Sequence, residues 1–146
     1  MKFSLGFLVA VCLCVFNLQP LRSAENAAAP GPEGVEWTLQ EIHGKPSRAR
    51  EKGRQTLKLE ARKKQVLGNG GVNHFFGGYE RTGDRLKLGP LACTEMAGPP
   101  ADMKAEAAYH AALAEVSHWR MSEGALELLK DRIVLLRFTA AKAAKN

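Results

Sequence analysis

Cysteine is scarce in this chain of 146 residues, which contains three. Two of them, Cys12 and Cys14, lie in an apolar N-terminal run, so Cys93 is the only one left if that run is removed as an export signal. A single cysteine cannot form an internal disulfide, and we therefore expect packing alone to hold the fold. Large apolar residues precede both N-terminal cysteines where a bacterial lipidation signal has a small residue, which argues against lipidation at Cys12 or Cys14.

Long hydrophobic runs are also few. The run from Leu5 to Phe16 is interrupted only by Gly6, and it is shorter than the stretch of about 20 residues that a transmembrane helix needs. Lys2 precedes this run, and polar and small residues follow it, as in a secretory signal peptide. We expect residues 1–24 to direct export to the periplasm or the outer membrane, leaving no transmembrane domain, and residues 25–34 to form a flexible linker. An uncleaved N-terminal anchor is the alternative.

The motifs of metal and nucleotide sites are missing. The histidines and Cys93 show no HxH, HExxH or CxxC spacing, and no Gly-Lys-Ser/Thr follows the central glycines. We therefore expect no metal site, no cofactor and no catalytic residue. A thiol- or histidine-dependent enzyme that uses Cys93 or His74 is an alternative. The alternating apolar setting of Cys93 instead favours a buried, inert thiol.

Acidic residues are outnumbered, since 21 lysines and arginines face 15 aspartates and glutamates. The surplus is local, because nine basic residues fall between Lys45 and Lys64 against two glutamates. Such a segment can attract lipopolysaccharide phosphates, anionic lipid or an acidic protein. Nucleic acid is not an expected partner, because no aromatic residues interleave the charges. The alternative is a loop that is only solvated. The basic loop expected to bind an anionic surface comprises Lys45, Arg48, Arg50, Lys52 and Arg54.

Glycine is abundant at the centre of the chain. Five glycines and two asparagines lie between Gly68 and Tyr79, with two phenylalanines among them. Glycine and asparagine adopt positive φ at low cost, and aromatic side chains can pin such a backbone in place. We interpret this stretch as an architectural crossing between strands.

Apolar and polar residues alternate in several short segments, which indicates strands with one buried face. The segment Asp102–Ser117 instead has apolar residues at helical spacing and an acidic start. This order predicts an α+β fold, in which a curled, mostly antiparallel and partly open, barrel-like sheet of about eight short strands packs on one α-helix. The domain is expected over residues 35–139, with a disordered tail over 140–146. The expected strands are Val35–Gln40, Thr56–Glu60, Gln65–Leu67, Tyr79–Arg81, Arg85–Leu88, Leu91–Met96, segments through Trp119 and through Leu126, and Ile133–Phe138.

The order of these motifs resembles the META domain, also called the HslJ-like domain. That family begins with a tryptophan strand that ends in glycine, as Trp37 to Gly44 does here. A glycine-rich centre with an asparagine and a tyrosine follows, then a threonine and methionine block, a helix and a Leu-x-Leu strand. The resemblance spans Val35 to Phe138. The residues that match the family motifs are Trp37, Gly68, Gly71, Asn73, Gly78, Tyr79, Thr94 and Met96.

The chain departs from the family pattern at two positions. The family often has cysteines where this chain has Val72 and Gly98, and the resemblance implies that the two positions are partners. A disulfide closing a loop of that size would contribute about 3 kcal/mol or more in the chain-entropy account. We expect Val72 to pack in the space that the missing disulfide leaves.

The resemblance implies an envelope protein that is associated with stress or antibiotic tolerance and has no established enzymatic reaction. We expect a monomeric, non-enzymatic binding or interaction module that acts on an envelope partner or an anionic surface. A carrier of a small apolar or lipid-like ligand, held between helix and sheet, is the alternative. That carrier would need an internal cavity lined by residues such as Trp37, Leu57, Phe75, Tyr109 and Leu113.

Overall fold

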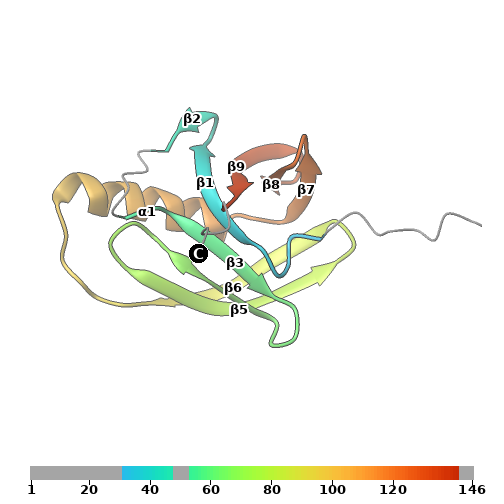
Figure 1. The fold of residues 1–146 in the computed structure, drawn as a ribbon, viewed down its shortest axis with the longest axis horizontal. Helices are drawn as coiled ribbons and strands as arrows, with labels where there is room; N and C mark the ends of the chain where they lie inside the picture. The colour runs from blue at the N-terminus through green and yellow to red at the C-terminus, as the bar shows by residue number, and fades with distance from the viewer. Residues whose placement is uncertain (1–30, 48–52, 142–146) are drawn as a thin grey trace, which may run out of the picture.

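The computed structural model describes residues 31–47 and 53–141, which fold into one antiparallel sheet and one helix (Figure 1). The expected export signal therefore lies outside the described residues, as do most of the linker and of the tail. In chain order the elements are β1 (Glu36–Ile42), β2 (Lys45–Pro46), β3 (Thr56–Glu60), β4 (Gln65–Asn69), β5 (His74–Thr82), β6 (Arg85–Cys93), α1 (Pro100–Ala114), β7 (His118–Ser122), β8 (Ala125–Lys130) and β9 (Ile133–Ala140).

Eight of the strands form a ring, because β1 pairs with β3 on one side and with β9 on the other. The ring is weakest between β6 and β7, where Arg85 and His118 are the only paired residues. Two backbone hydrogen bonds support this junction, from Leu86 N to the Ser117 carbonyl and from Trp119 N to the Asp84 carbonyl. The ring is therefore not a regular barrel. The predicted α+β class and the curled, partly open sheet are confirmed.

The helix is shorter at its C-terminal end than the expected Asp102–Ser117. It begins at Pro100, where the missing N–H costs nothing, and it ends at Ala114. The chain leaves the helix because Ser117 N donates a hydrogen bond to the Leu129 carbonyl of β8, which leads into β7. The spacing of apolar residues along the helix does not indicate this tertiary contact. No helix in the described part of the chain is long and apolar enough to cross a bilayer.

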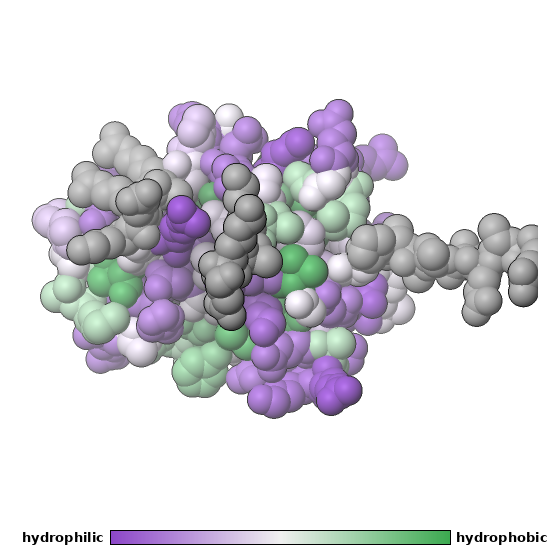
Figure 2. All heavy atoms as spheres, in the orientation of Figure 1, coloured by the Kyte–Doolittle hydropathy of each residue, from purple (hydrophilic) through white to green (hydrophobic). Residues whose placement is uncertain are grey.

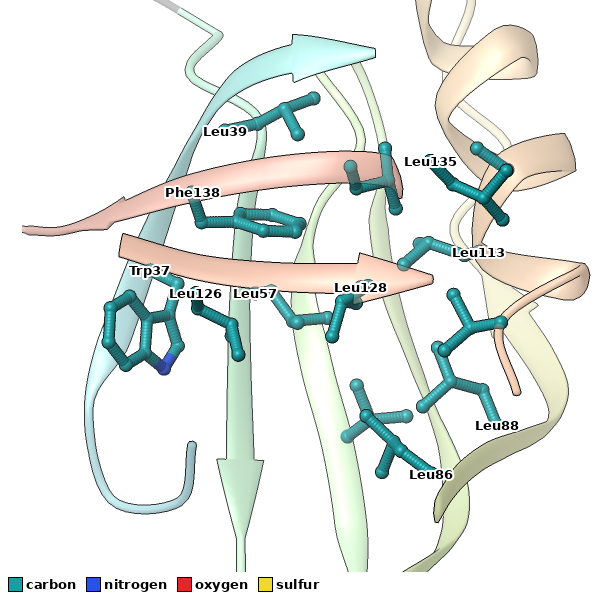
Figure 3. Packing of buried hydrophobic residues seen from close by; sticks show 14 of the residues in the cluster. Trp37, Leu39, Leu57, Leu86, Leu88, Leu113, Leu126, Leu128, Leu135 and Phe138 are labelled. Carbon is teal, nitrogen blue, oxygen red and sulfur yellow. The ribbon is translucent and has the colours of Figure 1, made fainter. Parts of the chain in front are cut away.

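The core fills the space between the ring and α1, which packs against β1, β6 and β9. Figure 3 shows side chains from these elements and from β3 and β8 pointing toward one another. Alternation along each strand supplies them, as in β3, where Leu57 and Leu59 are buried and their neighbours are not. Tyr109 and Leu113 bring the helix stripe to the same centre, where both are fully buried.

The glycine-rich stretch forms the β4–β5 hairpin rather than a separate segment between strands. β4 ends at Asn69, the turn includes Gly70 and Asn73, and β5 begins at His74. A second difference lies in β6, which runs as one strand through Gly89 and Pro90 where two strands were expected. A bulge opposite Gly78 takes up the extra residue, so that the strand continues past its proline.

Candidate functional site

The motif residues Asn73, Thr94 and Met96 meet around a buried carboxylate of α1. Glu106 accepts three hydrogen bonds from the β4–β5 turn: its Oε2 from Val72 N (2.9 Å) and Asn73 N (2.6 Å), and its Oε1 from Asn73 Nδ2 (2.7 Å). A hairpin turn leaves backbone N–H groups without a ladder partner, and Glu106 satisfies two of them. Sequence reasoning gave Glu106 no role, because a lone glutamate at a helical position carries no such signal.

The other side of Asn73 fixes the segment that follows β6. Its Oδ1 accepts hydrogen bonds from Thr94 Oγ1 (2.9 Å) and from Met96 N (2.7 Å). Gln55, which sequence reasoning also missed, extends the network by donating from Nε2 to the carbonyls of Gly70 and Ala105. We call these residues the Asn73–Glu106 cluster. It joins a turn, a strand end and the helix, which is the structural role expected for Asn73 and Thr94.

Gly70 and Gly68 allow the close approaches that the cluster needs. A Cβ at Gly70 would lie 2.7 Å from Oε2 of Glu106, so a side chain there would displace the carboxylate. A Cβ at Gly68 would lie 2.1 Å from the Thr56 carbonyl oxygen. Gly71 has φ of 123°, a conformation that other residues rarely adopt. The glycines are therefore architectural, as the sequence predicted.

The Asn73–Glu106 cluster stabilises the charged form of the Glu106 carboxylate. Burial alone would raise the pKa of Glu106, but hydrogen bonds from the side chain and backbone of Asn73 and from the backbone of Val72, with the nearby His110, hold it below its ordinary value. Among the described residues, no buried side-chain nitrogen or oxygen lacks a hydrogen-bond partner. Both oxygens of the Glu106 carboxylate therefore accept hydrogen bonds from the β4–β5 turn, which is a structural role.

Cys93 and His110 form a separate pair at the open edge of β6, with Sγ and Nε2 4.0 Å apart. The thiol was expected to be buried, but it is exposed. Cys93 pairs with Phe75 of β5 on one side, and no strand pairs with it on the other. Partial desolvation of the sulfur, with the charge of Glu106, raises the pKa of Cys93. Burial lowers the pKa of His110, and Glu106 opposes that shift only in part. The pair is therefore a neutral thiol beside a neutral imidazole near pH 7.

The remaining motif residues lie at the opposite end of the ring. Trp37 Nε1 donates to the Pro32 carbonyl (2.8 Å), which fixes the chain just before β1. Tyr79 donates from its hydroxyl to Glu33 Oε1 (3.2 Å), and burial, with Glu33, raises its pKa to about 12. Arg81 also donates to that carboxylate, from Nε at 2.7 Å. Gly78 lies at the β5–β6 bulge. These contacts attach residues 31–34 to the sheet.

A family model for the META domain matches residues 32–143. This chain belongs to the META domain family. An NMR structure of a protein from Burkholderia xenovorans is 23% identical, covers 86% of this chain and 100% of its own, and superposes with a TM-score of 0.60. A second NMR structure is 18% identical, covers 80% of this chain and 100% of its own, and has the same TM-score of 0.60. Both likenesses concern the fold alone. Comparison with curated proteins found no match.

The expected apposition of Val72 and Gly98 in this META domain is confirmed. A Cβ placed on Gly98 would lie 3.4 Å from Cβ of Val72 and 2.7 Å from its Cγ2. Disulfides have Cβ atoms about 3.5–4.5 Å apart, so the two positions have nearly the separation of a disulfide. The valine methyl groups occupy the space where a second side chain would lie.

The basic loop is described only at its ends. Lys45 is exposed in β2 and Arg54 is exposed just before β3, while Arg48, Arg50 and Lys52 lie outside the described residues. Ser47 Oγ donates to Gln55 Oε1 at 2.7 Å, which holds the two described ends together. Whether the loop binds an anionic surface stays a prediction.

The outward side of β3–β6 carries an aromatic residue whose exposure sequence reasoning did not predict. Phe75 is buried and Phe76, its neighbour, is 53% exposed, because side chains alternate across a strand. The cross-strand register places Leu67 and Ala92 on either side of Phe76. A pocket of about 500 Å³ adjoins Phe76 and includes Arg54 and His74. A second pocket, of about 390 Å³, lies farther along β5 and is lined by Lys64, Gly78, Tyr79, Glu80, Lys87, Leu88, Gly89 and Pro90.

We call this surface the outer sheet face, and its basic side chains outnumber its acidic ones by six to three. Glu60 is already paired with two of the lysines, Lys58 at 3.7 Å and Lys63 at 3.8 Å. Neither Lys64 nor Lys87 forms an ion pair with a described carboxylate. The face thus combines an apolar centre with a basic surround. Its charged residues are Arg54, Lys58, Lys63, Lys64, Arg85 and Lys87 against Glu36, Glu60 and Glu80.

Proposed function

We propose that this META-domain protein is a non-enzymatic interaction module of the cell envelope, which binds an anionic partner through the outer sheet face and the adjoining basic loop. The observation behind the proposal is that Lys64 and Lys87, which form no ion pair with a described carboxylate, lie on the same sheet face as the solvent-exposed Phe76. Positive potential over a surface raises the local concentration of anionic groups and speeds their encounter. Export to the periplasm or outer membrane, and a part in envelope stress or antibiotic tolerance, belong to the same proposal.

The core argues against the carrier. The five residues expected to line its cavity are each at most 3% exposed and belong to one packed cluster. Phe75 and Tyr109 fill the interface between sheet and helix with their rings edge to face, their centroids 5.9 Å apart and their planes at 72°. An apolar ligand would have to displace these contacts.

The chemistry argues against the enzyme. The Cys93 thiol is protonated near neutral pH, and both oxygens of the Glu106 carboxylate accept hydrogen bonds from the β4–β5 turn. His74, the other candidate, is exposed beside Phe76. Within the described residues, no three histidine, cysteine or carboxylate side chains gather as a metal site. The surface therefore offers binding more readily than catalysis.

Retention on immobilised heparin, a soluble polyanion, tests the proposed function. Reversing two cations of the outer sheet face, Lys64→Glu with Lys87→Glu, should weaken the affinity about tenfold or more at 0.1 M salt. The matched control, Lys104→Glu with Arg132→Glu, makes the same change of net charge on α1 and the β8–β9 turn, and both residues are exposed. Equal losses in the two double variants would mean that net charge alone governs binding, which would contradict a binding face.

A further inference from the structure

We infer that the outer sheet face docks on an anionic lipid bilayer, with Phe76 entering the boundary between headgroups and acyl chains while the surrounding cations contact lipid phosphates. This inference rests on the proposed function and names its partner. The anchor is a single ring on a rigid strand. It lies in the middle of a sheet, so its position relative to the cations is fixed by strand register rather than by a loop.

The register leaves Phe76 without cover. Leu67 on β4 is half-buried and Ala92 on β6 is small, so neither neighbour shields the ring. Gly77 and Gly78 follow it on the same strand and add no bulk. In Figure 2 hydrophobic residues reach the surface along the lower edge of the molecule, on the side where Figure 1 places β5.

The charges favour a lipid surface over a second copy of the chain. Two copies meeting through this face would bring a net positive surround against itself, which opposes pairing. A bilayer of anionic lipids instead offers phosphates to the cations and an apolar layer to the ring. Each Lys or Arg near such a surface contributes a favourable electrostatic free energy, so their effects on the binding constant multiply. Partial burial of one aromatic ring adds a hydrophobic contribution.

The topology disfavours an extended peptide as partner. A peptide that adds a strand needs a free edge. β4 and β5 offer none, because β4 pairs with β3 and β5, and β5 pairs with β4 and β6. The open edge of β6 lies on the side away from β5 and Phe76. The outer sheet face therefore presents side chains, not backbone groups. A membrane is a partner that offers these side chains a flat surface of apolar and anionic groups.

Vesicle flotation tests the inference on the protein purified from the cells that express it. Intact-mass spectrometry of that protein establishes where its N-terminus lies. Vesicles of phosphatidylglycerol and phosphatidylcholine should bind it, and vesicles of phosphatidylcholine alone should not. Phe76→Ala should weaken binding to the anionic vesicles about tenfold. The matched control is Ile133→Ala, which removes another exposed hydrophobic side chain, 67% exposed on the β8–β9 side of the ring, and should bind like the parent.

Heparin retention of the same variants separates the two proposals. Phe76→Ala should leave heparin binding unchanged, because a soluble polyanion offers no apolar layer, whereas the Lys64→Glu, Lys87→Glu variant should lose both activities. If Phe76→Ala floats like the parent, the bilayer inference is wrong and the anionic-partner proposal stands. If the parent sediments as a dimer that Phe76→Ala dissociates, a second copy covers the face and the inference is also overturned.

Discussion

At the scale of single residues, Glu106 links the β4–β5 turn to α1 through three N–H donors. Its pKa is lowered in the folded state, so the unfolded chain takes up a proton more readily. The contribution of Glu106 to the free energy of unfolding is therefore fully present above the ordinary pKa of 4.5. It is lost as the pH falls through the pKa that Glu106 has in the folded state. Glu106→Gln should lower the free energy of unfolding by about 2–3 kcal/mol at pH 7, because one N–H then faces an amide group that cannot accept it.

Urea unfolding between pH 3 and pH 7 measures this effect. The parent should lose stability below about pH 4.5 and Glu106→Gln should lose less, so the two curves converge in acid. Glu115→Gln is the matched control, because Glu115 is exposed and its pKa is also lowered, by Lys130. That control should change stability little at pH 7. Parallel curves for the parent and Glu106→Gln would contradict the role given to this carboxylate.

Phe75 and Phe76 show how much one position of a strand decides. Phe75 is 1% exposed and contacts both Tyr109 and His110 ring to ring, whereas Phe76 is 53% exposed. The composition of the stretch gives no sign of this difference. Only the start of β5 at His74 sets which phenylalanine faces the helix.

At the scale of elements, three segments far apart in the chain meet at Asn73: the β4–β5 turn, the segment after β6, and α1. Val72 and Gly98 belong to two of these segments. A Cβ on Gly98 would overlap the methyl groups of Val72, so both residues must change together. Gly98→Ala alone should destabilise the protein for that reason.

The double variant Val72→Cys, Gly98→Cys should form a disulfide and stabilise the fold. The loop-entropy account gives about 3–4 kcal/mol for a loop of this size, and the nearly matching Cβ separation limits native-state strain. Thermal unfolding with and without reductant measures the gain. A double variant that stays reduced under oxidising conditions, or that melts lower when oxidised, would contradict the apposition.

Secondary structure was predictable where one face of a strand is buried and the other is solvated. β1 and β3 show that alternation, and their positions were anticipated to within two residues at each end. The end of α1 was not, because its stop depends on Ser117 meeting a strand that comes later in the chain. β6 was expected as two strands, because a glycine and a proline read as a break when the bulge that accommodates them is not known.

At the scale of the whole molecule, the family and the curled, partly open sheet were predictable, because the order of the motifs can be followed along the chain without knowledge of the contacts. The candidate sites were less accessible. Local spacing does not reveal Glu106, which acts through residues more than 30 positions earlier. It does not reveal the outer sheet face either, since that surface is assembled from four strands by their register.

The central claim is that this protein binds with its outer sheet face and not with its interior. Titration of the isotopically labelled protein with a heparin oligosaccharide, followed by amide chemical shifts, locates binding directly. Binding at this face should shift the amide signals of Lys64, Phe76 and Lys87, and the shifts should fade as salt rises. Shifts centred on Tyr109 and Leu113 inside the core, or on the Cys93 and His110 pair, would contradict it.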